Sequence, residues 1–503
     1  MNLLRPSSRY LPLVAALVAV FSAPARAQSL LSLYEAARAY DATWQSAKAQ
    51  YDANLFKAEQ AKAGVLPAAN LAASDLRQHL GNDVPSIDRA YTTQSATVSA
   101  SQPLYRPANF ATYQQGKRQV ELAEAQLTAA SQDLIIRVSQ AYFDVLAAQD
   151  TLEFVRAQKA ATNEQLASAK RNFEVGTSTI TDTREAQARY DLVIAQEIAG
   201  ENDLRVKRLA LDSLVGKPDV NPAPLALPPQ LPEPKPADVN AWVQQGEENS
   251  PAIQQARTGV EIAQLETEKA KAGHKPTLDL VASYNVTRNV GGSASLPNDS
   301  RAKAGSVGLS FNLPLFAGFA TQNHLRETLS LEEKAQADLE AARRTVAQAT
   351  RTAYFGVVSG QSQVKALEAA EASSQSALEA NRLGYQVGVR INIDVLNSQS
   401  QLFQTKRDLA QARYNVLLGN LKLRQANGTL TVEDMNAINA TLAKNGSTPA
   451  PSLGERPQGA PSVPVTPPPI PVVPPVPVPP FNPPAPVMPS APPPPVILNP
   501  PAR

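Results

Sequence analysis

The chain has 503 residues and no cysteine, which excludes disulfides, thiolate metal sites and an N-terminal lipid-bearing cysteine. Of its 47 basic residues, three lie within positions 1–27; the other 44 stand against 45 acidic residues, a balance that does not indicate an electrostatic nucleic-acid binder. Aromatic residues make up only 5% of the chain while Ala and Gln abound, a composition suited to long, closely packed helices rather than to a globular core.

The N-terminal residues 1–27 have the pattern of a secretory signal peptide. Two arginines precede an apolar run, residues 11–21, and a small-x-small triplet, residues 25–27, follows it. The run is shorter than the roughly 20 apolar residues that a membrane-spanning helix needs. We therefore expect export through a Sec-type signal, with a mature chain that begins near Gln28.

The mature chain is an internal duplication. The segment "AKAGVLPAANLAAS" (61–74) matches "AKAGHKPTLDLVAS" (270–283), and Gly176 corresponds to Gly388, 212 residues later. The offset is nearly the same for each matching segment. The sequence therefore divides into a signal peptide (1–27), repeat 1 (28–215), a Pro-rich linker (216–240), repeat 2 (241–428), a short segment (429–447) and a Pro-rich tail (448–503).

The tail is low in complexity. It carries 24 of the 43 prolines, all from Pro449 onward, in runs such as "VTPPPIPVVPPVPVPP". Such a sequence cannot form helix or sheet, so we expect an extended, polyproline-like and largely disordered segment. Either it is a dispensable solvated tail, or it serves as a docking ligand or a cell-wall spacer.

Each repeat is expected to contain a helix, two strands, a long helix and a shorter helix. At a rise of 1.5 Å per residue, the long helices reach roughly 100 Å, which exceeds both a globular domain and a bilayer. They are therefore expected to pack on each other as a coiled-coil-like bundle or a hollow barrel. From their periodicity and their Gly and Pro boundaries, the helices are expected at 30–64, 108–173, 182–215, 239–272, 317–387 and 394–427.

The strands are expected to form two hairpins. In repeat 2, apolar residues alternate with Ser, Asn, Thr and Gly, the pattern of a strand with lipid on one side and water on the other. The polar stretches 77–88 and 288–304 are expected to be surface loops. The strands are expected at about 67–80 and 91–103 in repeat 1 and at about 276–288 and 305–316 in repeat 2.

A single hairpin of this kind would also fit a soluble β-sandwich, but two hairpins beside very long helices in a secreted chain favour the membrane. Membrane-spanning barrels are closed, and the smallest have about eight strands. Four strands cannot close, so several chains would have to share one barrel.

These features resemble the TolC-like outer-membrane efflux proteins. The resemblance is carried by "AYF" (141–143), "RNFEVGTSTITD" (171–182), "VGLSFNLPLF" (307–316) and "GYQVGVRINIDVLNSQSQL" (384–402), in the order and spacing of that family. It covers nearly the whole mature chain, up to about residue 445.

The resemblance implies a mainly α fold with a membrane β part. Four strands per chain would build one shared barrel in a homotrimer, in contact with outer-membrane lipid. The helices would form a periplasmic α-barrel, and the linker (216–240) and residues 429–447 would form a mixed α/β equatorial region.

The resemblance also implies a function. The trimer would be the outer-membrane exit duct of tripartite efflux and type I secretion systems in a Gram-negative cell. It would pass small toxic molecules or proteins outward, with a periplasmic adaptor protein and an inner-membrane transporter as partners. Alternatives are a passive outer-membrane porin and a structural coiled-coil envelope protein.

The sequence contains no motif for catalysis. "GKP" at 216–218 lacks the rest of a phosphate loop, and His79, His274 and His324 lie outside any metal or nucleophile motif. We therefore expect no enzyme activity, no cofactor, no metal and no nucleic-acid partner.

Two helix turns are the candidate functional site. Gly176 and Gly388 are expected to make these turns, because glycine accepts a left-handed backbone at the end of a helix. Asp182 and Asp394 follow six residues later, where a carboxylate at the start of the next helix is favoured by the helix dipole.

The family resemblance adds roles for particular residues. It implies a latch in which Tyr385 and Arg390 bond to Asp182 and Thr181 and hold the periplasmic mouth shut. It also implies a pore constriction of two carboxylates on the inner helix. Asp394 matches the first, but Asn397 stands at the second, so weaker cation affinity is expected.

Overall fold

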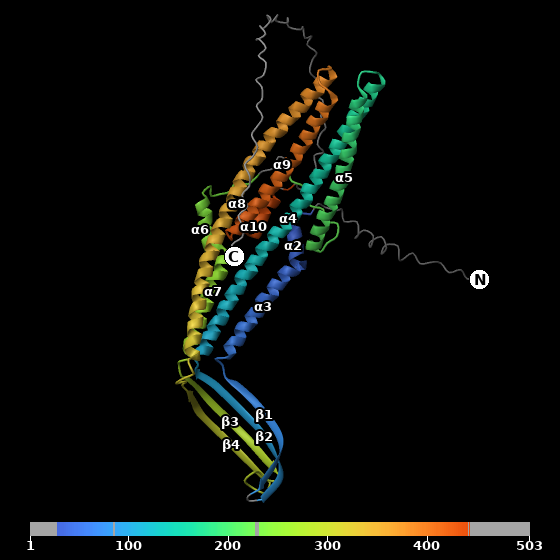
Figure 1. The fold of residues 1–503 in the computed structure, drawn as a ribbon. Helices are drawn as coiled ribbons and strands as arrows, with labels where there is room; N and C mark the ends of the chain where they lie inside the picture. The colour runs from blue at the N-terminus through green and yellow to red at the C-terminus, as the bar shows by residue number, and fades with distance from the viewer. Residues whose placement is uncertain (1–27, 84–85, 227–230, 441, 443–503) are drawn as a thin grey trace, which may run out of the picture. The chain divides into compact units, whose positions relative to one another are not determined.

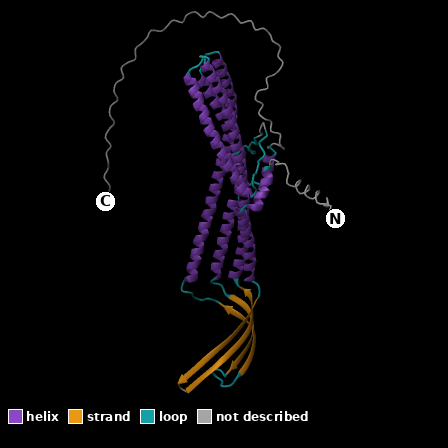
Figure 2. Ribbon diagram, turned by 90° about the vertical axis from the view of Figure 1, so that its right-hand side faces the viewer, coloured by secondary structure: helices purple, strands orange, loops and turns teal. Residues whose placement is uncertain are grey.

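The structure is a computed structural model that describes residues 28–83, 86–226, 231–440 and 442, all within the first of two units, Met1–Thr448. The expected signal peptide and Pro-rich tail lie outside these residues. Long helices make up most of the described chain, and four strands form a single sheet (Figures 1 and 2). No helix among the described residues is both long and apolar enough to span a membrane.

Repeat 1 contains four helices rather than the expected three. Asp41 divides the segment expected as one helix over 30–64, because its carboxylate accepts the backbone N–H of Trp44 at 2.7 Å and so caps the helix that follows. The helices are α2 (Leu30–Tyr40), α3 (Ala42–Ala63), α4 (Pro107–Glu174) and α5 (Ile180–Val215).

Repeat 2 has the same break at the equivalent place. The expected helix over 239–272 ends at Asn249, because Pro251 lacks an N–H and is accommodated only in the first turn of a new helix. The prediction of one continuous helix in each repeat was therefore wrong. The helices are α6 (Val239–Asn249), α7 (Pro251–Ala272), α8 (Ala320–Gln386), α9 (Asn392–Ala426) and, beyond the repeat, α10 (Val432–Asn439).

The sheet joins the two repeats through its central strands. Its order is β1 (Ala68–Asp83), β2 (Ser86–Tyr105), β3 (Thr277–Val290) and β4 (Ser300–Asn312), and all neighbours are antiparallel. The surface loop expected at 77–88 was wrong, because the β1–β2 ladder continues to the pair Asp83–Ser86. A polar sequence can continue a ladder, since backbone groups form its hydrogen bonds.

The register gives the sheet two different faces. Leu278 lies opposite Phe311 and Leu280 opposite Leu309, so the apolar residues of β3 and β4 share one face. On the other face Ser283 lies opposite Ser306, and their hydroxyls are 2.9 Å apart. The sheet is a single layer, and it therefore has one exposed apolar face and one polar face.

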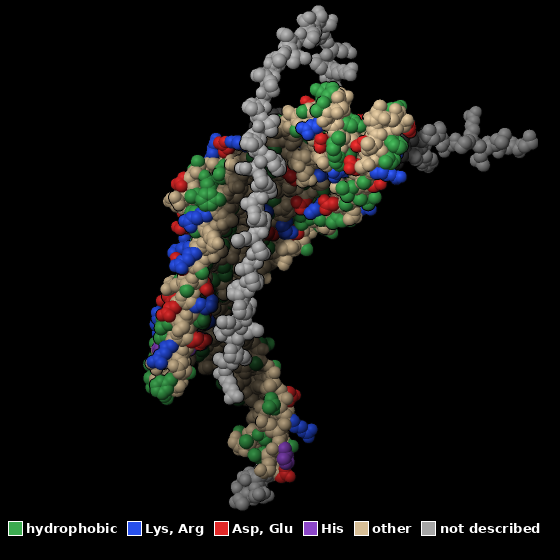
Figure 3. Space-filling view, turned by 45° about the horizontal axis from the view of Figure 1, so that its top comes forward, with side chains coloured by type: hydrophobic (Ala, Val, Ile, Leu, Met, Phe, Trp, Pro, Cys, Tyr) green, Lys and Arg blue, Asp and Glu red, His purple; other side chains and the backbone are tan. Residues whose placement is uncertain are grey.

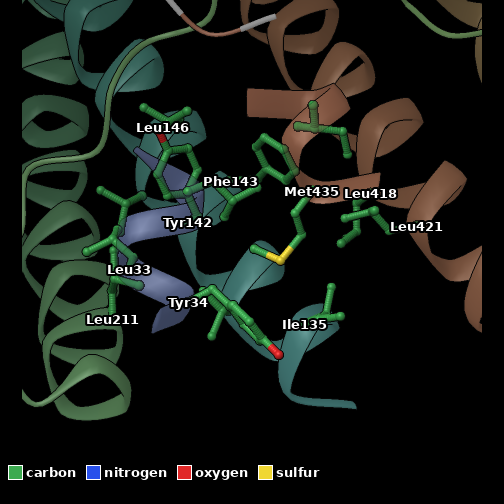
Figure 4. Packing of buried hydrophobic residues seen from close by; sticks show 14 of the residues in the cluster. Leu33, Tyr34, Ile135, Tyr142, Phe143, Leu146, Leu211, Leu418, Leu421 and Met435 are labelled. Carbon is green, nitrogen blue, oxygen red and sulfur yellow. The ribbon is translucent and has the colours of Figure 1, made fainter. Parts of the chain in front are cut away.

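The largest core cluster lies where α2, α4, α5, α9 and α10 meet. The fully buried residues there include Leu417 and three that Figure 4 labels, Tyr142, Leu211 and Met435. Tyr142 also donates its hydroxyl to the backbone carbonyl of Ala223 at 2.8 Å. This cluster fixes the short helices against the long ones. On the face seen in Figure 3, the helices carry charges of both signs in mixed order.

Candidate functional site

The turns of the two long helix hairpins lie together, at the end of α4 that is farthest from the sheet (Figure 1). Gly176 between α4 and α5 has φ +78°, and Gly388 between α8 and α9 has φ +75°. Both values fall in the left-handed region that favours glycine. An added Cβ would meet no other atom at either position, so the backbone conformation, not space, selects glycine.

The turn between α4 and α5 is closed by a capping box. Thr179 Oγ1 accepts the backbone N–H of Asp182 at 3.2 Å, and Asp182 Oδ2 accepts the backbone N–H of Thr179 at 3.0 Å. The Ser178 hydroxyl also donates to Asp182 Oδ2, at 2.8 Å. Burial favours the neutral carboxyl, but these hydrogen bonds outweigh it and hold the pKa of Asp182 below its usual value.

The turn between α8 and α9 lacks such a cap. Ile391 occupies the N-cap position and has no side-chain hydrogen bond to the helix. Arg390 Nη1 lies 3.7 Å from Asp394 Oδ2, and the Arg390 side chain is 57% exposed. The hydroxyl of Tyr385 accepts a hydrogen bond from Asn172 Nδ2 on α4 at 3.3 Å. This turn is therefore closed by its own backbone hydrogen bonds, such as Val389 N–H to the Gly384 carbonyl at 2.9 Å, and by the contact of Tyr385 with α4.

The latch expected from the sequence is not formed inside one chain. Among the described residues, the carboxylate of Asp182 accepts hydrogen bonds from Ser178 and Thr179 and not from Tyr385 or Arg390. Thr181 is exposed and takes no part in the capping box. The three bonds to the Asp182 carboxylate all end on Oδ2, and within the chain the Tyr385 hydroxyl instead accepts from Asn172.

Asn392 is a residue of this site that the sequence reasoning missed. Its side chain is fully buried and connects three helices. Its Oδ1 accepts from Gln165 Nε2 on α4, and its Nδ2 donates to the backbone carbonyl of Asp182 on α5 at 3.2 Å. A comparison of the two repeats could have indicated this residue, because the polar Asn392 stands where repeat 1 has the apolar Ile180.

The two residues expected at the pore constriction have different surroundings. The side chain of Asp394 is 33% exposed and faces Arg390 of the same turn. Asn397 is exposed, and its Oδ1 accepts a hydrogen bond from Arg189 Nη2 on α5 at 2.8 Å. Among the described residues, no group of three or more His, Cys, Asp or Glu side chains could hold a metal ion.

Long paired helices that continue into a four-stranded, two-faced sheet define the class of outer-membrane channels with a helical extension. The family model described as "Outer membrane efflux protein" matches residues 33–217 and 242–429. The chain belongs to this family. The resemblance to the TolC-like proteins is thereby confirmed.

Individual relatives agree with this assignment. The chain is 33% identical over 438 residues to the outer membrane protein TolC of Vibrio cholerae, covering 86% of this chain and 98% of the relative. It is 32% identical over 434 residues to the alkaline protease secretion protein AprF of Pseudomonas aeruginosa, covering 84% and 89%. The solved structure of the outer membrane protein VceC of Vibrio cholerae superposes with a TM-score of 0.68 at 21% identity, covering 79% and 96%.

Proposed function

We propose that three copies of this chain form one exit duct through the outer membrane of a Gram-negative cell. The observation that carries the proposal is the sheet. Its edge strands β1 and β4 each pair on one side only, while Leu71, Val307 and Leu309 are 74%, 78% and 65% exposed on one face. An open sheet edge is not stable in lipid, so the edges must pair with other chains.

Three chains of four strands each give twelve strands, within the range of outer-membrane barrels. Strand counting alone permits other multiples of four, and the trimer rests on the family resemblance. The apolar face would contact lipid, and the Ser, Thr and Asn face would line a water-filled lumen. The helices would extend this lumen into the periplasm, and the duct would catalyse nothing.

The turns would be the closed periplasmic mouth of the duct and the place where a periplasmic adaptor and an inner-membrane transporter engage. In the trimer, the exposed guanidinium of Arg390 would bond to Asp182 and Thr181 of the neighbouring chain, while Tyr385 holds the turn to α4. Arg–carboxylate contacts are directional and can be broken when partners bind. Asp394 and Asn397 would line the constriction.

The cargo would be small toxic molecules, proteins, or both, since an efflux protein and a protein-secretion protein both match this chain. One relative is named the outer membrane efflux protein BepC and another the alkaline protease secretion protein AprF. Cross-linking in cells followed by identification of the captured adaptor and transporter would decide which system the duct serves.

The test of the duct itself is electrical. Purified protein is expected to require detergent, to run as a heat-sensitive trimer on gels and to form small, gated conductances in planar bilayers. Large, permanently open conductances would instead support a passive porin. Trimers that need no detergent and do not conduct would support a structural coiled-coil protein and overturn the proposal.

A further inference from the structure

The apolar face of the sheet ends in a band of positive charge. On this face, Leu280, Tyr284 and Val286 of β3 are followed by Arg288, which lies directly opposite Arg301 of β4. One row closer to the helices, Lys303 lies opposite Val286. All three cations are exposed, and none forms an ion pair with any described residue.

The Arg288–Arg301 pair is unfavourable as it stands. Residues directly opposite in an antiparallel pair have Cβ atoms about 5 Å apart, and like charges in such positions destabilise the sheet. The acid in this row is Asp75 on β1, which accepts from the Gln94 side chain at 3.3 Å and lies two strands from Arg288. An anion bound between the two guanidinium groups would turn their repulsion into a shared attraction.

The three cations share the apolar face, whereas the strand arginine on the polar face, Arg89 of β2, donates to the backbone carbonyl of Ser293 at 3.1 Å. On the other face, the neighbouring row consists of Ser74, Ser95, Thr287 and Ala302, none of which is charged. The face that carries these cations is the one that would contact lipid.

The distance along the strand also fits a lipid headgroup. Leu278 and Arg288 are ten residues apart on β3, or about 33 Å at the rise of a strand. A tilt of roughly 40° reduces this to a height of about 25 Å, which is the height of the apolar band of outer-membrane barrels. Arg288 and Arg301 therefore lie at the border between acyl chains and headgroups, on the side away from the helices.

We propose that Arg288, Arg301 and Lys303 bind the phosphate groups of a phosphorylated glycolipid in the outer leaflet. Arginine pairs bind phosphate oxygens through parallel N–H donors, and Lys303 supplies a further point charge. The acyl chains of the same lipid would lie on Tyr284 and Val307, which are 49% and 78% exposed. This inference rests on the proposed membrane barrel.

The test uses the full-length, detergent-purified trimer and native mass spectrometry. Diphosphoryl lipid A, monophosphoryl lipid A and inorganic phosphate are titrated separately into the wild type and into the double variant Arg288→Gln/Arg301→Gln. The matched control is Arg205→Gln/Arg326→Gln, which removes two exposed helix arginines. We expect the wild type and the control to bind diphosphoryl lipid A most tightly, and the double variant to bind it at least tenfold more weakly.

Equal lipid binding by the double variant and the wild type would overturn the inference. So would wild-type binding of inorganic phosphate at the same concentrations as lipid A, because that result would indicate a simple anion site. Conductance and gel mobility are measured on the same samples. A double variant that forms conducting trimers and still binds lipid A defeats this inference alone, whereas a wild type that forms no conducting trimer defeats the proposed function.

Discussion

The side-chain amide of Asn392 donates to the backbone carbonyl of Asp182, 3.2 Å away, and so ties the start of α9 to the first turn of α5. Both helices begin at a turn of the candidate site, and the Asn392 side chain is fully buried. Gln165 of α4 completes the contact from the other side. One amide thus connects the two repeats at the tip of the molecule.

Replacing Asn392 by Ile, the residue at the equivalent position of repeat 1, is expected to loosen this tip. The change removes the part-buried bond to the Asp182 carbonyl and leaves the Gln165 amide without its acceptor, at a cost of about 1–3 kcal/mol. Hydrogen–deuterium exchange of residues 160–185 should become faster. The control is Asn415→Ile on the exposed side of α9, which should leave that exchange unchanged. Equal protection in both variants would argue against a role for the amide.

Removing the proposed latch is expected to raise single-channel conductance several-fold in planar bilayers. Arg390→Ser removes the cation that would reach a neighbouring chain, and Tyr385→Phe removes the acceptor of the Asn172 bond. Arg344→Ser is the control, because it removes an equivalent charge from α8 far from the turn. The latch would be rejected by variants with wild-type conductance.

Asn397→Asp is expected to strengthen block of the conductance by multivalent cations, because it adds one carboxylate per chain at the proposed constriction. Arg189 already donates to residue 397, and its charge would offset part of the new carboxylate. The double variant Arg189→Gln/Asn397→Asp is therefore expected to be blocked at lower cation concentrations than Asn397→Asp. Arg189→Gln alone serves as the control. Unchanged block in both Asp variants would show that residue 397 does not line the pore.

Asp150 is expected to make stability depend on pH. Burial raises its pKa to about 6, although Tyr414 donates to its carboxylate at 2.7 Å. An acid whose pKa is raised in the folded state holds its proton more tightly there than in the unfolded chain. Its contribution to stability is therefore lost as pH rises from about 4 to 6, on the order of 2–3 kcal/mol per chain.

The measurement is the thermal midpoint of the purified protein between pH 4 and pH 7. Asp150→Asn keeps an acceptor for Tyr414 but does not titrate, so its midpoint should fall less over this range than that of the wild type. The exposed Asp203→Asn variant should follow the wild type. Parallel curves for all three proteins would show that Asp150 does not titrate in this range.

The sequence predicted much of this fold because its patterns are local. The apolar alternation in β3 and β4 placed Leu280 and Leu309 on one face, and the register agrees. The breaks at Asp41 and Pro251 were missed because a single polar residue or a proline leaves the helical period on either side almost intact. The polar end of the β1–β2 hairpin is predicted to be a loop, because the backbone hydrogen bonds that pair the strands do not require apolar side chains.

The site was harder to predict than the fold. The turn glycines are visible because few other residues accept their backbone angles, but the partners of a side chain depend on packing. Asp182 illustrates this, because within the chain its carboxylate accepts hydrogen bonds through Oδ2 from its own turn and not from Tyr385 or Arg390. Asn392 shows the reverse case, in which an ordinary polar residue becomes important only when α4, α5 and α9 come together.

The two turns differ in how their second helices begin. α5 starts with a reciprocal cap from Thr179 and Asp182, whereas α9 starts after Ile391 with no side-chain cap. An uncapped first turn frays more easily, by about 1 kcal/mol. With one side-chain cap missing, the α8–α9 hairpin is the one expected to open first at the proposed mouth, while the capped start of α5 stays in place.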